Sequence, residues 1–278
     1  MKILSLFDGI SCGRVALERA GMPVEVYYAS EIDKYATQIS QKNYPDIIRL
    51  GDVCKITKEM VGEVDMIIGG SPCQSFSNAG NRTGFEGKSG LFYEFVRLVK
   101  EIQPKYFLLE NVKMKQEWQD IISEELGVKP IEINSSLVSG QSRKRLYWTN
   151  IPNVKLPEDK GIYLKDIITG LGEDITERMN KKIKGTLSYK KCWSNVRKLS
   201  QKSKTLTAGG QGISNSGATN ILYNNGTYHK LTEVECERLQ TLPDNYTQGV
   251  SSTQRYKAIG NGWTVDVIAH IFKNLTNN

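Results

Sequence analysis

The residues in this sequence best suited to chemistry are one cysteine and one glutamate. Cys73 comes directly after the segment Gly69-Gly70-Ser71-Pro72, at the end of an apolar run that predicts a buried strand. A thiolate held there could act as a nucleophile, the alternative being a buried structural cysteine. Glu110 follows the apolar pair at 108–109, at the predicted end of a strand. A partly desolvated carboxyl at such a position can have a raised pKa and donate a proton. The alternative for an isolated glutamate is a surface or helix-capping position.

Two arginines form a second candidate group. The segment Gln141-Ser142-Arg143-Lys144-Arg145 places its guanidinium groups two positions apart, which puts them on one face if the chain is extended. Guanidinium groups near a nucleophile can bind phosphate or orient a base. The alternative is a solvated basic turn.

A glycine-containing turn and two carboxylates suit a ligand that contains adenosine. The turn at 7–13 leads from a strand to a helix but lacks the G-x-G-x-x-G pattern, which disfavours dinucleotide binding. Glu31 ends the second predicted strand and suits ribose hydroxyls, and Asp52 could accept a hydrogen bond from an adenine amino group.

Alternating strands and helices position these residues. Buried strands are predicted at 2–7, 24–29, 64–68 and 106–109, with helices at 15–20 and 34–42 between them. This alternation predicts an α/β fold with a parallel sheet flanked by helices. Ligands of such sheets bind at the carboxyl ends of the strands, so we expect the candidate residues to share one pocket.

Composition narrows the function classes. The chain has 278 residues, 37 Lys and Arg against 30 Asp and Glu, and a net charge of +7, which favours a polyanionic partner. Only two histidines, His229 and His270, argue against a Ser-His-Asp triad and a His-rich zinc site. Five cysteines without a C-x-x-C pair argue against a disulfide framework, so no metal site and a cytoplasmic setting are predicted. The sequence contains no stretch of 18 apolar residues, so no membrane span is predicted.

Three parts are predicted along the chain. Residues 1–150 form a catalytic and cofactor-binding domain, residues 151–230 a small lysine- and glycine-rich lobe, and residues 231–278 a helical segment that returns to the first domain. Two interpretations of the lobe's basic surface remain open: it is a solvated surface, or it binds a polyanion.

Taken in order, the motifs resemble the C5-cytosine DNA methyltransferase family over residues 2–272. They are Phe7-Asp8-Gly9-x-x-x-Gly13, Gly70-Ser71-Pro72-Cys73-Gln74, Glu110-Asn111-Val112, Gln141-x-Arg143-x-Arg145, Thr205-Leu206-Thr207 and Tyr256-Lys257-Ala258-Ile259-Gly260-Asn261-Gly262-Trp263. The chain is similar to the bacterial and phage enzymes and, at Ser71, in its short lobe and at 262–265, to the catalytic domains of the mammalian de novo enzymes.

The resemblance implies a Rossmann-like, S-adenosylmethionine-dependent methyltransferase fold and a flipped-out target cytosine in duplex DNA. Cys73 would attack C6 of the cytosine, and Glu110 would hydrogen-bond or protonate N3. C5 would then take the methyl group from S-adenosylmethionine, which leaves S-adenosylhomocysteine. Arg143 would hold the base at its carbonyl, and Arg145 would touch phosphate or the base.

The resemblance also implies two sets of binding residues. The cofactor would be bound by Phe7, Asp8, Gly9, Ile10, Ser11, Cys12, Glu31, Ile32, Asp52, Val53, Leu91, Asn261, Gly262 and Trp263. DNA would be contacted by Gln74, Ser77, Arg82, Arg143 and Arg145, and by the lobe at 151–230, which would recognise the target. The family often has a tryptophan where Ile32 stands and a serine where Gly262 stands.

The resemblance implies double-stranded DNA as the partner and association with the nucleoid when the enzyme acts. It also allows a cognate restriction endonuclease as a second partner. The nearest alternative is a tRNA cytosine-5 methyltransferase, whose Cys-Phe-Thr signature is absent here because Cys192 is followed by Trp193. Two further alternatives are a non-catalytic DNA-binding paralogue and a nicotinamide oxidoreductase. A paralogue without activity should have lost Cys73, Glu110 or Arg143, and all three are present.

Replacing Cys73 with alanine is expected to abolish methyl transfer and to leave DNA binding intact, because the thiolate is needed for addition to C6 and not for affinity. Labelled-methyl incorporation and a DNA-binding titration measure the two properties. The same substitution at Cys54 serves as the control and should leave turnover unchanged. Normal turnover by the Cys73→Ala variant would contradict the mechanism.

Overall fold

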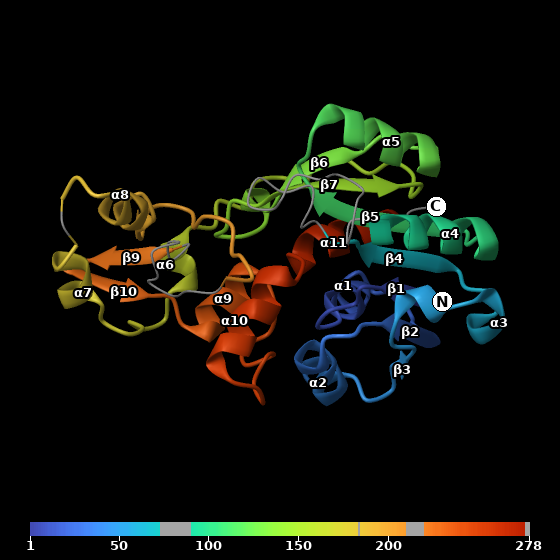
Figure 1. Ribbon diagram of the computed structural model, residues 1–278, viewed down its shortest axis with the longest axis horizontal. Helices are drawn as coiled ribbons and strands as arrows, with labels where there is room; N and C mark the ends of the chain where they lie inside the picture. Colours follow the sequence, from blue (N-terminus) through green and yellow to red (C-terminus); the bar gives the residue numbers. More distant parts are fainter. Residues whose placement is uncertain (73–89, 183, 210–219, 276–278) are drawn as a thin grey trace. The chain divides into compact units, whose positions relative to one another are not determined.

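The computed structural model of the chain describes residues 1–72, 90–182, 184–209 and 220–275 (Figure 1). The chain divides into two compact units, each with its own sheet. Unit 1 comprises residues 1–134, 144–156 and 267–278, and unit 2 comprises residues 135–143 and 157–266. No helix in the described part of the chain combines the length and apolar character needed to cross a bilayer.

Unit 1 contains a seven-stranded sheet in the order β3-β2-β1-β4-β5-β7-β6. Its first five strands are parallel, whereas β7 runs antiparallel to both β5 and β6. The strands are β1 (Lys2–Leu6), β2 (Val26–Ser30), β3 (Ile48–Arg49), β4 (Met66–Gly70), β5 (Tyr106–Val112), β6 (Ile131–Asn134) and β7 (Lys144–Thr149). The strand order reverses direction between β1 and β4, which is where open α/β sheets bind ligands.

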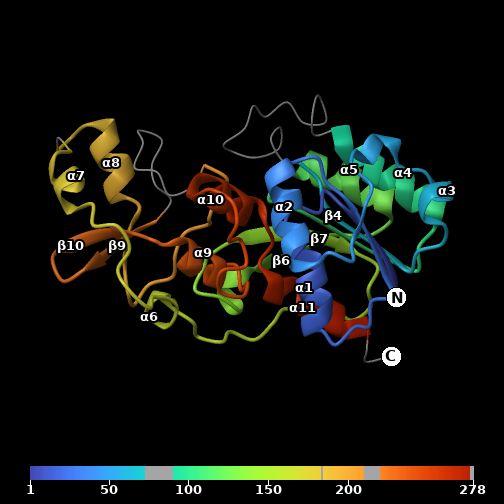
Figure 2. The same ribbon diagram turned by 90° about the horizontal axis from the view of Figure 1, so that it is seen from below.

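Helices cover both faces of this sheet. Figure 2 shows α4 and α5 on one side, and α1 and α11 on the other. The helices are α1 (Cys12–Arg19), α2 (Lys34–Asn43), α3 (Lys58–Val61), α4 (Phe92–Ile102), α5 (Gln116–Leu126) and α11 (Val265–Phe272), with the 3-10 turns η1 (Val53–Lys55) and η4 (Lys273–Leu275). The helix α2 begins after Asp33, whose carboxylate accepts hydrogen bonds from the main chain of Tyr35 and Ala36.

The core of unit 1 explains why its strands are apolar runs without strict alternation. Leu4, Ile67 and Leu109 face α4 and α5 and pack in one cluster with Phe92 and Phe95. Their neighbours along the strands are also buried, because the opposite face is covered too.

Unit 2 is smaller and has a three-stranded sheet in the order β10-β9-β8. Its elements are η3 (Ser135–Leu137), α6 (Leu164–Ile167), α7 (Thr176–Asn180), α8 (Leu187–Trp193), β8 (Val196–Lys198), β9 (Ile221–Asn224), β10 (Thr227–Lys230), α9 (Glu233–Leu239) and α10 (Ser252–Asn261). The helix α9 begins with a capping box, in which Thr232 and Glu235 each bond the main chain of the other.

The sequence predicted β1, β2, β4 and β5 but placed the end of β5 too early. This strand continues through Glu110 to Val112, because β7 pairs with it and Glu110 lies opposite Tyr147. Glu110 is therefore inside a strand and not at its end. Helix α1 likewise begins at Cys12, three residues before the predicted start. The antiparallel strands β6 and β7 were not predicted.

The two units divide the chain at different places from the predicted boundaries at 150 and 230. Residues 231–266 belong to unit 2, because α9 and α10 pack there. Leu231, Leu239 and Ile259 join Leu164 and Leu206 in one hydrophobic cluster. The segment that returns to unit 1 begins only at Val267.

The Leu109→Ala substitution is expected to lower the free energy of unfolding by about 2–5 kcal/mol, because this fully buried side chain would leave a cavity. Urea unfolding measures the change. The matched control is Leu156→Ala, whose side chain is 59% exposed and should cost less than about 0.5 kcal/mol. Equal losses from the two variants would contradict the assigned core.

Candidate functional site

The carboxyl ends of three neighbouring parallel strands gather candidate residues of unit 1. Phe7, Glu31 and Ser71 come directly after β1, β2 and β4. Leu6 pairs with Ser30 on one side and with Gly69 on the other, so these strand ends are neighbours. The edge predicted from sequence therefore exists and brings these residues together.

The turn after β1 has an unusual backbone. Phe7, Gly9 and Ser11 have φ angles of 56°, 60° and 60°. The left-handed region is unfavourable for residues other than glycine, so side-chain contacts must hold this turn. The Asp8 carboxylate accepts hydrogen bonds from the Ser11 hydroxyl and, at 2.8 Å, from the Tyr27 hydroxyl. The Glu31 carboxylate accepts one from the Gly9 main chain at 2.8 Å.

Asp8 is the half-buried centre of a polar network. Burial raises the pKa of its carboxyl above the ordinary value, while hydrogen bonds from Ser11 and Tyr27 act in the opposite direction. The Ser11 hydroxyl also bonds the Ser40 hydroxyl, which accepts a hydrogen bond from Arg49 at 2.9 Å. The turn is thus connected to α2 and to the end of β3.

Two carboxylates supply acceptors beside this turn. Oε1 of Glu31 accepts hydrogen bonds from the main chain of Ile32 and Asp33, at 2.8 and 2.7 Å. Asp52 follows β3 and accepts one from the main chain of Cys54 at 3.0 Å. Such acceptors match the hydroxyl and amino groups of adenosine, so these two carboxylates fit S-adenosylmethionine.

The other predicted cofactor residues of unit 1 differ in what they can offer. The side chains of Ile10, Ser11, Cys12 and Val53 are buried, which leaves their main chain for a ligand. Phe7 and Leu91 are partly buried and pack against the same hydrophobic core. Ile32 is 79% exposed.

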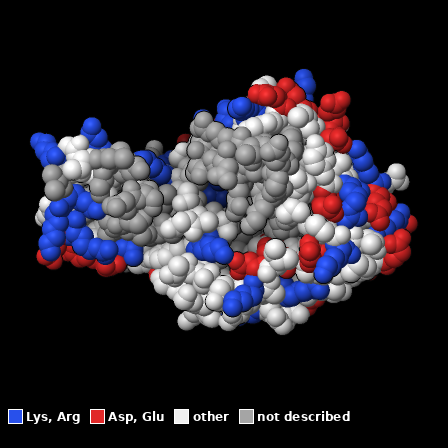
Figure 3. Space-filling model, viewed as in Figure 1, with Lys and Arg blue, Asp and Glu red and all other residues white. Residues whose placement is uncertain are grey.

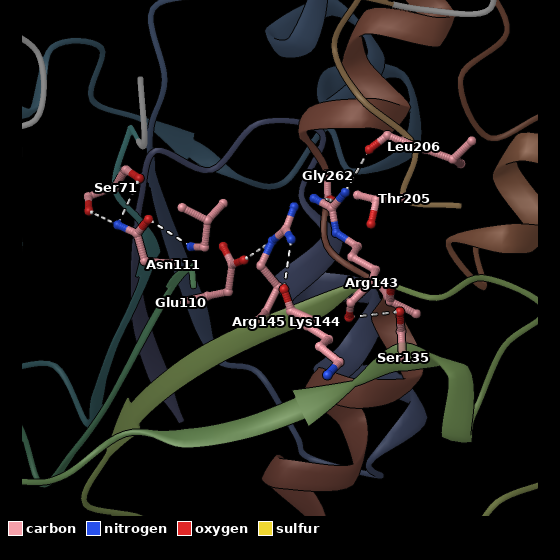
Figure 4. A network of polar contacts seen from close by, with 12 residues as sticks. Ser71, Glu110, Asn111, Ser135, Arg143, Lys144, Arg145, Thr205, Leu206 and Gly262 are labelled. Carbon is pink, nitrogen blue, oxygen red and sulfur yellow. Dashed lines mark hydrogen bonds and ion pairs between the residues drawn. The ribbon is translucent and has the colours of Figure 1, made fainter. Parts of the chain in front are cut away.

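Glu110 and Arg145 form a buried ion pair across β5 and β7. Nε of Arg145 lies 2.9 Å from Oε1 of Glu110, and Glu110 is only 8% exposed (Figure 4). The antiparallel register, which pairs Val112 with Arg145, delivers the guanidinium to this carboxylate. Gly70, the last residue of β4, pairs with Glu110 on its other side.

Asn111 holds the end of β4. Its side-chain amide donates to the Ser71 hydroxyl at 3.0 Å, and the Val112 main chain donates to its carbonyl oxygen at 2.8 Å (Figure 4). Asn111 stands in the sequence motif Glu110-Asn111-Val112, from which no role was predicted for it. Its position next to Glu110 was the one available signal.

Arg143 belongs to unit 2 and has a different set of partners. It is 5% exposed, and its guanidinium donates to the carbonyl oxygens of Leu206, Gly260 and Gly262, at 2.8, 3.3 and 3.1 Å (Figure 4). Arg143 and Arg145, which are two positions apart in the sequence, therefore bond different elements.

Two glutamines complete the buried contacts around these carbonyl groups, and only one of them was noticed in the sequence. Gln141 is fully buried and accepts a hydrogen bond from the Leu206 main chain at 2.8 Å. Gln240, which was not predicted from the sequence, donates to the carbonyl oxygens of Gly262 at 3.0 Å and Ile259 at 2.8 Å. A buried glutamine has no signature in the sequence.

The remaining predicted residues are placed as follows. Asn261 is exposed and Gly262 and Trp263 are partly buried, all in unit 2. Cys73, Gln74, Ser77 and Arg82 lie outside the described residues. Among the residues that the structure describes, no group of three or more His, Cys, Asp or Glu side chains could hold a metal ion.

Comparison with known proteins identifies relatives along the whole chain. A model of the family "C-5 cytosine-specific DNA methylase" matches residues 1–147 and 132–277. The type II methyltransferase M.FnuDI of Fusobacterium nucleatum is 31% identical over 99% of this chain and 94% of its own length. The orphan methyltransferase M.SPRI of Bacillus phage SPR is 39% identical over 54% of this chain, which covers 38% of the phage protein.

Solved structures share the fold. The methyltransferase EhMeth of Entamoeba histolytica superposes with a TM-score of 0.79 at 18% identity, covering 100% of this chain and 98% of its own. This likeness confirms the predicted Rossmann-like methyltransferase fold.

The Asp8→Asn substitution is expected to change how stability depends on pH. The folded carboxyl has a pKa above its ordinary value of 3.8, so the folded state binds more protons and the wild type loses stability as the pH rises above about 4. The asparagine variant lacks this loss. Urea unfolding from pH 4 to pH 7 should show the difference in unfolding free energy moving in favour of Asn. A difference independent of pH would contradict the raised pKa of the Asp8 carboxyl.

Proposed function

This chain belongs to the C-5 cytosine-specific DNA methylase family, and from that premise we propose that it transfers a methyl group to C5 of a flipped-out cytosine in duplex DNA. The methyl donor in this proposal is S-adenosylmethionine. The type II name of the relative M.FnuDI supports a DNA substrate and allows a cognate restriction endonuclease as partner.

The observation that carries the proposal is the ion pair of Glu110 with Arg145. A buried carboxylate requires a counter-charge or hydrogen bonds, and Arg145 supplies both at 2.9 Å. A carboxyl and a guanidinium side by side match the N3 and carbonyl edge of cytosine, where the carboxyl meets the ring nitrogen and the guanidinium meets the oxygen. The pair also lies beside β4, whose last residue is three positions before Cys73.

In the proposed reaction, Cys73 adds to C6 of the cytosine and the ring becomes electron-rich at C5. The thiolate forms the S–C6 bond, and Glu110 stabilises the charge that develops at N3 by hydrogen bonding or protonation. C5 then takes the methyl group. Loss of the C5 proton to a base and cleavage of the S–C6 bond restore the aromatic ring and the free thiolate.

The two arginines take different parts in this proposal. Arg145 faces the base, because its guanidinium is already beside Glu110. Arg143 is a positioning residue, since its guanidinium joins the segment at Leu206 to the main chain at Gly260 and Gly262. The base contact that the resemblance implied for Arg143 is therefore assigned to Arg145.

S-adenosylmethionine, when bound, supplies the electrophilic methyl group. In the proposal Glu31 binds the ribose hydroxyls and Asp52, with the main chain of Val53, the adenine. The turn from Phe7 to Cys12 contributes its main chain and the Phe7 ring, and Leu91 contributes an apolar contact. The contacts of Asp8 and Glu31 preset the turn, so little ordering is needed on binding.

The function is tested by methyl incorporation from labelled S-adenosylmethionine into duplex DNA and into tRNA, measured in parallel. We expect label in duplex DNA that is recovered as 5-methylcytosine. Label in tRNA alone would replace the proposal with the RNA alternative. Folded protein that labels neither nucleic acid would contradict the proposal.

Glu110 and Arg145 are expected to act as one unit. Glu110→Gln should lower the rate of methyl transfer by roughly 10²–10⁴-fold, the range for a lost acid–base group, and Arg145→Ala should cause a comparable loss. The double variant should be little worse than either single variant, because each loss already removes the unit. The matched control is Lys113→Ala, which breaks an exposed ion pair with Glu132 and should leave the rate unchanged. Losses that multiply in the double variant would contradict the unit.

A further inference from the structure

Unit 2 contains a basic cleft that none of the proposed catalytic steps uses. Its volume is about 480 Å³, and its described lining is Ser142, Arg197, Lys202, Ser203, Lys204 and Thr205. The lining has three cations, three hydroxyl groups and no carboxylate. Figure 3 shows further Lys and Arg side chains on the visible face of unit 2 around α7 and α8.

The floor of the cleft is rigid. The main chain of Ser142 donates to Ser203 at 2.9 Å, and the main chain of Ser203 donates to Gly140 at 2.7 Å. The Thr205 hydroxyl donates to the Ser142 carbonyl oxygen at 2.8 Å. These bonds join two segments that are about 60 residues apart in sequence, so the hydroxyl groups have fixed positions.

One of the three cations is already neutralised. Nζ of Lys202 lies 3.6 Å from a carboxylate oxygen of Asp159, and it also donates to the Ser136 carbonyl oxygen. Its ammonium group lies over the Tyr163 ring, 5.2 Å from the centroid. Lys202 therefore lines the cleft but adds little uncompensated charge to it.

The other two cations lack an acidic partner in the described part of the chain. Lys204 donates to the Asn195 side-chain oxygen at 2.8 Å, and Arg197 donates to the main chain of Val196 at 2.7 Å. Burial lowers the pKa of the Lys204 ammonium, and repulsion from Arg197 lowers it further. Two like charges beside each other are unfavourable unless an anion compensates them.

A buried hydroxyl gives a second, independent indication of a ligand. Ser203 is 1% exposed, and its hydroxyl has no hydrogen-bond partner among the described residues. Buried polar groups are normally bonded, and an unbonded one in a ligand cleft is a feature that a ligand can satisfy.

We propose that this cleft binds a phosphate of the DNA backbone through Lys204 and Arg197. The inference rests on the proposed function for the identity of the anion, and it adds a binding site outside the catalytic residues. A phosphate contact of this kind positions the duplex without reading its sequence. The cleft therefore contributes to affinity on every duplex, cognate or not.

The test is the salt dependence of duplex binding by Lys204→Gln. The slope of log K against log salt should fall by about 1 relative to the wild type, the value for one lost phosphate contact, on cognate and random duplexes alike. The matched control is Lys165→Gln, an exposed lysine of α6 that lies outside the cleft, which should change the slope less. Lys204→Arg keeps the charge and should restore the wild-type slope.

Duplexes with single neutral methylphosphonate linkages locate the contact. One linkage should weaken binding by the wild type more than binding by Lys204→Gln, which keeps only the Arg197 contact with that phosphate. An unchanged slope for Lys204→Gln, or an equal fall for Lys165→Gln, would overturn the phosphate site even if the wild type methylates DNA. If Lys204→Gln lowers the slope as predicted but the wild type transfers no methyl group, the proposed function is overturned and the phosphate site stands.

Discussion

The buried ion pair between Glu110 and Arg145 is the constraint on which the site in unit 1 depends. A carboxylate in the interior of a sheet is costly without a counter-charge, and the antiparallel strand β7 brings that charge to 2.9 Å. The sheet therefore needs the β6–β7 extension beyond its parallel part, and β5 needs to run on past Glu110 to pair with it. The fold and the proposed chemistry meet in this one contact.

The turn after β1 also depends on a few carboxylate contacts. The positive φ angles of Phe7 and Ser11 would be unfavourable in isolation, and hydrogen bonds to the Asp8 and Glu31 carboxylates stabilise the turn. Asp8 is half-buried in this position, and desolvation raises the pKa of its carboxyl. In the proposed function, these contacts preset the main chain that receives the cofactor, and Arg143 performs the corresponding task in unit 2 by bonding three carbonyl groups.

Much of this could be predicted from the sequence, for identifiable reasons. The strands β1, β2, β4 and β5 are buried on both faces and so appear as apolar runs, and their carboxyl ends carry the motif residues. The strands β6 and β7 escaped prediction because Ile131–Asn134 is short and mostly half-buried, and Lys144–Thr149 begins with two cations. Pairing between distant segments determines these strands more than local pattern does.

The parts of the site that escaped prediction share a cause. Arg143 and Arg145 are two residues apart in the sequence, but their partners belong to different elements. No spacing rule predicts which carbonyl or carboxylate each guanidinium group will contact. The buried contacts of Gln240 and the cation pair of Lys204 with Arg197 also depend on segments that tertiary structure brings together. Local sequence indicated which residues matter more reliably than what they touch.

Methylation of cytosine C5 in duplex DNA can be tested by base-resolution sequencing of 5-methylcytosine in cells that express this chain. We expect new 5-methylcytosine at a recurring sequence in cells with the wild-type chain and none with Cys73→Ala. Soluble wild-type protein that leaves the DNA without new 5-methylcytosine would contradict it.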